Sequence, residues 1–191
     1  MKKTALRCLI VLAGLAAGLP PALPAADAEG PALCVGCHGP TGAGIDPGIP
    51  MIAGQSPIFI TYALKAFAAG VWPSPVMGPI AQTLTDEQIR EAAEFFSRQE
   101  AFRQKQLVDR EKAEVGERLH AELCEKCHIN GGREYDEYEA VLVGQWMHHL
   151  RKVLEQYQRG ERAAEAMMLE KLAKLGPDQI EALVHYYGRG E

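Results

Sequence analysis

Apolar residues recur at helical spacing near the end of each half of this chain. In the first half they follow Thr85, an N-cap residue with Gln88 placed to complete a capping box. Their spacing puts one set of side chains on a single helix face: Ile89, Ala92, Ala93 and Phe96. In the second half Pro177 suits a first helical turn and precedes a matching stripe: Ile180, Leu183, Val184 and Tyr187. The pattern predicts a closing helix in each half, with its stripe in the core.

The rest of the chain also favours helices, because little of it alternates between apolar and polar residues as strands do. In each half we expect a short helix leading into a cysteine pair, an irregular loop, a helix after a Gly-Gln pair, a second loop and the closing helix. Residues 98–111 are largely polar and charged, without proline or glycine, which indicates a linker. This linker runs into a predicted helix that carries Val115, Leu119 and Leu123.

A fixed set of spacings recurs in the two halves. In both halves the same number of residues separates a histidine from the Gly-Gln pair that follows it. The number of residues from the glutamine of each pair to a further glycine is also the same in both halves. The first set is His38, Gly54-Gln55 and Gly70, and the second is His128, Gly144-Gln145 and Gly160. The segments Leu84–Ile89 and Leu175–Ile180 also correspond. These spacings indicate a tandem duplication, with one domain over residues 29–104 and another over 105–191.

The segment 1–28 has the features of an export signal. A cationic start is followed by an apolar run over positions 9–19, which is too short to span a bilayer, and then by prolines. We therefore expect a signal peptide at 1–28, cleaved after Ala25 or Ala28, and a mature periplasmic chain without a membrane anchor. Cys8 lacks the small residue that a lipoprotein cleavage site needs before its cysteine, and we assign it no role.

The chain is acidic. Its formal charge is −5, and removal of a leader with three basic residues and one acidic residue makes the mature chain about −7. Such a chain has no basic footprint for nucleic acid or for anionic lipid. The expected partners are proteins with neutral or basic docking faces.

Four of the five cysteines form two tight pairs, each followed directly by a histidine. The pairs are Cys34-Val-Gly-Cys37-His38 and Cys124-Glu-Lys-Cys127-His128, each a complete C-x-x-C-H motif. In this motif the thiols add to the vinyl groups of one haem, and the histidine then ligates the iron. A redox-active dithiol would need a βαβ pattern around it, and a zinc site would leave the adjacent histidines unexplained. A disulfide is the third alternative, but haem attachment uses every residue of both motifs. The motifs therefore predict two covalently bound haems, one in each half.

Each iron also needs a ligand on its other face, and methionine is usual in electron transfer because the thioether favours the ferrous state. In the first half Met77 lies in a proline-rich loop, and its rival is Met51, which lies before the Gly-Gln pair. The second half offers two candidates. Met167 lies as far after its motif histidine as Met77 does after its own, whereas Met168 lies as far before the closing helix of its half as Met77 does. We favour Met77 and Met168, because insertions are tolerated in the loop before the methionine.

An iron with an open coordination position would instead indicate peroxidase chemistry or ligand sensing. His148 and His149 are rival ligands, but they fall where a helix begins and are expected on the surface. Trp72 and Trp146 are expected in the core or beside the haem edges. Because both halves supply a methionine in register, the sequence favours electron transfer over a haem enzyme.

Two such domains in tandem resemble the dihaem cytochromes c of the c-four family, over essentially the whole mature chain. The second half is similar in detail to the cytochrome subunit of flavocytochrome c sulfide dehydrogenase. The stretches that carry this narrower resemblance are Cys124–Gly132, the acidic stretch Glu134–Glu139 and Gly144-Gln145-Trp146. The haem motifs themselves are shared by many families.

The resemblance implies an all-α fold of two tandem class I cytochrome c domains. It assigns one haem to Cys34, Cys37, His38 and Met77, and the other to Cys124, Cys127, His128 and Met168. It also implies an FAD-binding flavoprotein subunit that oxidises sulfide and forms a heterodimer with the cytochrome. The cytochrome has no substrate site of its own and passes electrons to a soluble acceptor protein. The alternative is a free-standing dihaem carrier that donates electrons to a terminal oxidase.

Class I domains also place a proline before the Gly-Gln segment, and its carbonyl accepts the ring N–H of the haem-ligating histidine. Pro50 fits this role in the first half, but Ala140 stands at the matching position of the second. A backbone carbonyl remains available there, so we expect the difference to affect the rigidity and the potential of the second site.

Overall fold

The computed structural model describes residues 29–101 and 103–190, so the predicted signal peptide lies outside the described residues. Within these ranges the regular elements are helices and no strand occurs, which confirms the all-α prediction for this part of the chain. The helices are α1 (Glu29–His38), α2 (Pro57–Ala68), α3 (Met77–Thr83), α4 (Asp86–Ser97), α5 (Arg110–Leu123), α6 (Ile129–Gly132), α7 (Met147–Gln158), α8 (Ala166–Leu172) and α9 (Pro177–Gly188).

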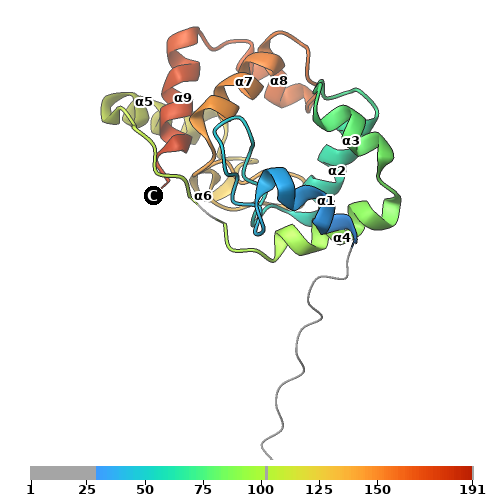
Figure 1. Ribbon diagram of the computed structural model, residues 1–191. Helices are drawn as coiled ribbons and strands as arrows, with labels where there is room; N and C mark the ends of the chain where they lie inside the picture. Colours follow the sequence, from blue (N-terminus) through green and yellow to red (C-terminus); the bar gives the residue numbers. More distant parts are fainter. Residues whose placement is uncertain (1–28, 102, 191) are drawn as a thin grey trace, which may run out of the picture.

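The helices form two groups that occupy different sides of the molecule (Figure 1). In the first, α1 and α2 pack against α4, and α2 also packs against α3. In the second, α5 and α7 pack against α9, and α7 also packs against α8. Each group has its own buried apolar cluster, around Phe96 in the first and around Val184 in the second. This arrangement agrees with the duplication, while the residue at which one domain ends stays a prediction.

The two closing helices form as their sequences predict. At the start of α4 the Thr85 hydroxyl accepts from the Gln88 N–H at 3.2 Å, and the Gln88 side chain accepts from the Thr85 N–H at 2.9 Å. Pro177 occupies the first turn of α9. Both predicted stripes are buried: Ile89, Ala92, Ala93 and Phe96 on α4, and Ile180, Leu183, Val184 and Tyr187 on α9. Burial of these side chains supplies much of the apolar stabilisation of each half.

Glycines allow the first and last helices of each half to cross closely. A Cβ on Gly30 of α1 would lie 2.3 Å from the Gln88 carbonyl oxygen, and one on Gly116 of α5 would lie 2.1 Å from that of Ala182. The buried line of α5 is therefore Ala113, Gly116 and His120. The predicted helix is present, but its Val115 is 39% exposed, because the close glycine contact turns a different face toward α9.

We expect Gly116→Ala to lower the free energy of unfolding by about 1–3 kcal/mol, because the added methyl group forces α5 away from α9. Chemical denaturation of the haem-loaded protein measures this change. Gly176→Ala at the start of α9 is the control, since a Cβ there would meet only the Gln179 side chain, at an ordinary contact distance of 3.9 Å. A Gly116→Ala protein as stable as the wild type would show that the crossing is not tight.

Two short helices and the linker add features beyond the sequence prediction. The proline-rich segment expected to be a loop contains α3, which begins at Met77, and its counterpart in the second half is α8. The linker precedes α5 as predicted, and its glutamines bind both halves. Gln104 donates to the Ala43 carbonyl at 2.6 Å, and Gln106 donates to the Gln145 carbonyl at 2.9 Å. The linker is therefore tied to the two groups of helices that it joins.

Candidate haem sites

Both C-x-x-C-H motifs lie at the end of a helix. The first occupies the last turns of α1, and the second starts at Cys124, the C-cap of α5, and forms the turn that follows it. All four cysteines of the motifs are free thiols. Cys37 and Cys127 are exposed, whereas burial raises the pKa of Cys34 and of Cys124. Paired thiols beside a histidine fit the covalent attachment of a haem.

His38 is buried and is oriented by the backbone. Its Nδ1 lies 2.9 Å from the Pro50 carbonyl oxygen, which is the hydrogen bond expected from the sequence. With its proton on Nδ1, the ring has an unprotonated Nε2 available to an iron. Burial lowers the pKa of His38, although the Pro50 carbonyl opposes this effect, so the ring is neutral at neutral pH.

The second motif histidine lacks this hydrogen bond. Nδ1 of His128 is buried and has no hydrogen-bond partner among the described residues. Burial lowers its pKa, and the Ala140 carbonyl at the position matching Pro50 lies near enough to oppose this effect. The carbonyl expected to orient the ring therefore lies beside it, but outside hydrogen-bond geometry with Nδ1. An alanine does not fix the backbone as a proline does, which agrees with the looser arrangement.

The methionines predicted as sixth ligands lie on short helices. Met77 is the first residue of α3 and packs, half-buried, against the first core. Met168 lies in α8 and packs, half-buried, against the second core, whereas its neighbour Met167 is 49% exposed. Met168 is therefore the member of this pair that faces the interior. Its coordination of iron stays a prediction.

Two glutamines join the halves in a reciprocal arrangement. The Gln55 side chain donates to the Val141 carbonyl at 3.0 Å and accepts from the Val141 N–H at 2.9 Å. The Gln145 side chain makes the same pair of bonds with Met51, at 2.9 and 3.0 Å. Both glutamines are buried, and both belong to the repeated Gly-Gln pairs. The repeat thus extends into the contact between the halves, and Met51, the rival ligand, takes part in it through its backbone.

Known proteins resemble the chain over one or both halves, although no protein-family model matches it. It is 40% identical over 83 residues to the cytochrome subunit of sulfide dehydrogenase from Chlorobaculum tepidum, over 42% of this chain and 74% of that protein. It is 28% identical over 174 residues to cytochrome c4 from Thiocapsa roseopersicina, over 85% of this chain and 89% of that protein. With the thiosulfate dehydrogenase electron acceptor of Stutzerimonas stutzeri it shares 37% identity over 67 residues, which span 34% of this chain and 31% of that protein.

A solved structure has the same fold. Reduced recombinant cytochrome c4 from Pseudomonas stutzeri matches with a TM-score of 0.72 and 28% identity, over 86% of this chain and 98% of that one. The chain belongs to the dihaem class I cytochromes c. The predicted fold of two tandem class I domains is confirmed.

The second half of the dihaem cytochrome contains a polar network, centred on the buried His120, that the sequence did not reveal. His120 of α5 is 1% exposed; its Nδ1 lies 2.8 Å from the Tyr187 hydroxyl and its Nε2 lies 2.7 Å from a Glu125 carboxylate oxygen. The same oxygen accepts from the Gly131 N–H at 2.9 Å. Since Glu125 lies inside the haem motif, the network ties that motif to α5 and α9. Val35 stands at the matching position of the first motif and cannot do this.

Other residues singled out in the sequence are placed as follows. His148 of the dihaem cytochrome is exposed as expected, whereas His149 is half-buried and burial lowers its pKa to about 3. Trp72 is 3% exposed, as an aromatic core residue would be. The Nε1 of Trp146 is buried without a hydrogen-bond partner among the described residues.

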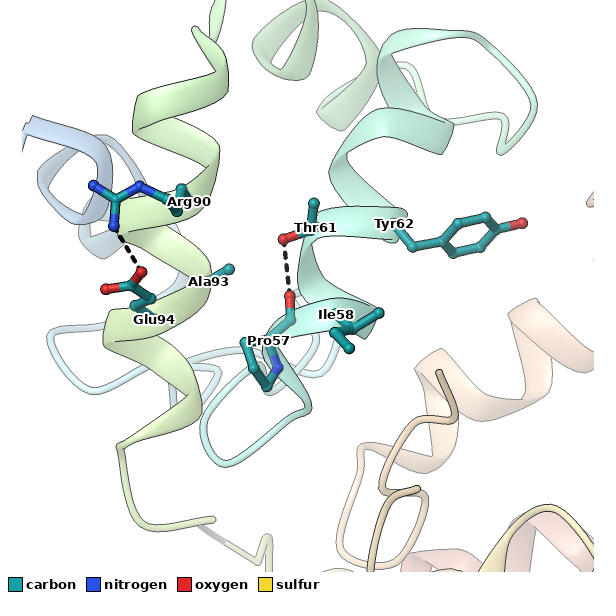
Figure 2. A pocket seen from close by; sticks show the side chains of 7 residues that line it. All are labelled: Pro57, Ile58, Thr61, Tyr62, Arg90, Ala93 and Glu94. Carbon is teal, nitrogen blue, oxygen red and sulfur yellow. Dashed lines mark hydrogen bonds and ion pairs between the residues drawn. The ribbon is translucent and has the colours of Figure 1, made fainter. Parts of the chain in front are cut away.

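An open groove of about 440 Å³ runs between α2 and α4 of the dihaem cytochrome (Figure 2). Thr61 donates to the Pro57 carbonyl on α2 and Arg90 pairs with Glu94 on α4, so neither interaction spans the groove. In the second half the corresponding helices are α7 and α9, and Arg151 of α7 pairs with Glu181 of α9. The lining residues are Pro57, Ile58, Thr61, Tyr62, Arg90, Ala93 and Glu94, which include none of the predicted haem ligands.

Over residues 29–101 and 103–190 of the dihaem cytochrome, no helix has the length and apolar character needed to cross a membrane.

Proposed function

We propose that this dihaem cytochrome is the electron-accepting subunit of an FAD-containing sulfide dehydrogenase and passes the electrons to a soluble acceptor protein. As a dihaem class I cytochrome c, the chain is an electron-transfer protein. The observation that carries the narrower proposal is its 40% identity to the cytochrome subunit of sulfide dehydrogenase. The sequence of the second haem motif and the acidic stretch after it support the same partner.

The proposal gives each half a complete set of haem-binding residues. Cys34 and Cys37 would attach the first haem, with His38 and Met77 as its iron ligands. Cys124 and Cys127 would attach the second, with His128 and Met168 as its iron ligands. When bound, the haems supply one-electron chemistry through the ferric and ferrous states of iron.

The residues of the chain orient these groups and fix the two sites relative to each other. The Pro50 carbonyl orients the ring of His38, and the half-buried Met168 packs its thioether against the core of the second half. The reciprocal bonds of Gln55 and Gln145 hold one half against the other. A fixed separation between the sites favours a relay in which electrons enter at one haem and leave from the other.

A free-standing carrier that donates electrons to a terminal oxidase is the second candidate. Its support is the match to cytochrome c4, which extends over 85% of this chain and 89% of that protein. Both candidates use the same haems and ligands. They differ in whether a flavoprotein stays bound.

The export signal predicted at residues 1–28 supports a periplasmic location for either candidate. Expression of the full chain, osmotic release of the periplasm and N-terminal sequencing test this location. We expect a mature chain that starts at Ala26 or Glu29. Recovery of the uncleaved chain with the membranes would contradict it.

We expect the native protein to co-purify with a flavoprotein, because an electron-accepting subunit is a permanent part of its complex. The measurement is gel filtration of the native periplasmic fraction, with flavin and haem absorbance followed together. Sulfide should then reduce the haems of the pooled fractions. A cytochrome that elutes alone, without flavin absorbance and without sulfide-dependent reduction, would favour the free-standing carrier.

A further inference from the structure

The helices that lead into the two haem motifs end at different places. α1 runs through its motif to His38, whereas α5 ends at Leu123, directly before Cys124. The last carbonyl groups of a helix have no partner inside that helix, and the Leu123 carbonyl is one of these. The matching residue of the first half, Leu33, lies inside α1, where the helix itself supplies the partner. The second motif therefore begins beside a carbonyl that needs a donor from elsewhere in the chain.

Lys171 of α8 supplies this donor. Its ammonium group donates to the Leu123 carbonyl oxygen at 2.6 Å, in a partly buried position. The partial negative charge at the C-terminal end of a helix also favours a cation at this place. Burial raises the pKa of the Cys124 thiol, and the charge of Lys171 is among the effects that oppose this rise. The ammonium group therefore lies close to a cysteine that is predicted to attach the second haem.

α8 is also held by α7, the helix against which it packs. The Gln158 side chain at the end of α7 donates to the Leu172 carbonyl at 2.9 Å and to the Leu175 carbonyl at 2.8 Å. Met168 lies on α8 three residues before Lys171, which is close to one helical turn. Two side chains, Gln158 and Lys171, thus fix the short helix that carries Met168, one from α7 and the other at the start of the second haem motif.

The first half has different residues at both of these positions. Counted from the methionine of each half, the residue that matches Lys171 is Ile80, whose side chain has no hydrogen-bond donor. Counted from the glycine that ends each repeat, Ala68 stands at the place of Gln158. α3 is linked to α2 by the Gln82 side chain, which donates to the Ala68 carbonyl at 3.2 Å in an exposed position. Water competes for an exposed bond, so this link is the weaker one.

We propose that Lys171 is a positioning residue of the second haem site, which holds α8, and with it Met168, against the start of the second haem motif. A short helix can move away from its neighbours, so the bond between methionine and iron depends on how firmly that helix is held. The second iron should therefore keep its methionine under conditions in which the first iron has lost its own. The inference rests on Met168 as the predicted ligand and holds whether or not a flavoprotein is the partner.

The test is competition between methionine and added imidazole at the ferric haems of the haem-loaded protein. Imidazole takes the place of a methionine that leaves the iron, and the red charge-transfer band of methionine-ligated haem is then lost. We expect two phases in the wild type, with the second haem requiring more imidazole than the first. Met168→Leu identifies the phase of the second haem, because this variant should lack it.

Lys171→Met should raise the apparent affinity for imidazole about tenfold in the phase of the second haem and leave the other phase unchanged. This factor is the one expected from the loss of one charge-assisted hydrogen bond. The same variant should lower the equilibrium constant for reduction of that haem alone, because a weaker thioether bond favours the ferric state. Lys171→Arg keeps both the charge and a donor, and it should restore most of the wild-type behaviour.

The matched control is Lys174→Met, which makes the same chemical change at an exposed lysine whose partner is Glu170 at 2.7 Å. We expect it to titrate like the wild type. The proposal is overturned if Lys171→Met also titrates like the wild type, or if it changes both phases equally, as a general loss of stability would. The reverse order of the two phases in the wild type would contradict it as well.

Two further outcomes are decided by other variants. If Lys171→Met fails to load haem, Gln158→Leu takes its place, since it removes the bonds that hold α8 from α7. Gln158→Leu should raise the imidazole affinity in the phase of the second haem, and an unchanged affinity there would count against the proposal. Retention of both phases in Met168→Leu would remove the ligand on which the inference rests and overturn it. The electron-accepting role would be unaffected, because co-purification with a flavoprotein tests it separately.

Discussion

Met168→Leu is expected to lower the reduction potential of one haem by on the order of 0.1–0.3 V. The thioether of methionine stabilises ferrous iron, and leucine offers no donor atom in its place. The half-buried position of Met168 against the second core makes it the member of the methionine pair that can reach the interior. The measurement is a redox titration, together with the red charge-transfer band of methionine-ligated ferric haem, which should lose about half its intensity as one of two haems changes ligand.

Met167→Leu is the matched control, because it makes the same chemical change one residue earlier at a side chain that is 49% exposed. We expect its potentials and its charge-transfer band to equal those of the wild type. Loss of the band in Met167→Leu together with its retention in Met168→Leu would reverse the assignment. Retention in both variants would mean that neither methionine ligates iron.

Gln145→Leu is expected to lower the free energy of unfolding by about 2–4 kcal/mol. The substitution removes both hydrogen bonds that the side chain makes with Met51, and it leaves the N–H and the carbonyl of that residue buried and unpaired. Chemical denaturation followed by circular dichroism measures the change. Because these bonds join the halves, limited proteolysis should also cut the linker of this variant faster.

Gln82→Leu provides the comparison, since Gln82 is an exposed glutamine that donates to the Ala68 carbonyl at 3.2 Å within the first half. Its loss should change the free energy of unfolding by well under about 1 kcal/mol. Equal stability of the Gln145→Leu and Gln82→Leu proteins would show that the reciprocal bonds do not hold the halves together.

Regular elements with a strong local signal could be predicted from the sequence. The apolar stripe of α4 and the Thr85–Gln88 capping box act within one helix, so local spacing is enough to reveal them. The hydrogen bond from His38 to the Pro50 carbonyl could also be expected, because it accompanies a recognisable motif. The helical start at Met77 could not, since three prolines in the segment 73–79 favour a loop by local criteria.

Features of the site that depend on the pairing of distant segments were not predictable. The Gly-Gln repeat is visible in the sequence, but Gln55 bonds to the backbone of Val141. Because a backbone partner does not depend on the residue type, the sequence does not identify it. His120 meets Tyr187 only after α5 and α9 have packed. His149 lies at the start of a helix, where a surface position is the ordinary expectation, and its partial burial depends on the segments that pack around α7.

The number of haems attached to each chain tests the central claim most directly. Mass spectrometry of the denatured mature protein detects covalently bound haem, and the haem absorbance per chain gives an independent count. We predict two covalently bound haems in the wild type and one in the Cys34→Ser/Cys37→Ser variant, in which the second motif remains intact. A wild-type chain with fewer than two attached haems, or with haem that dissociates on denaturation, would contradict the assignment of one haem to each half.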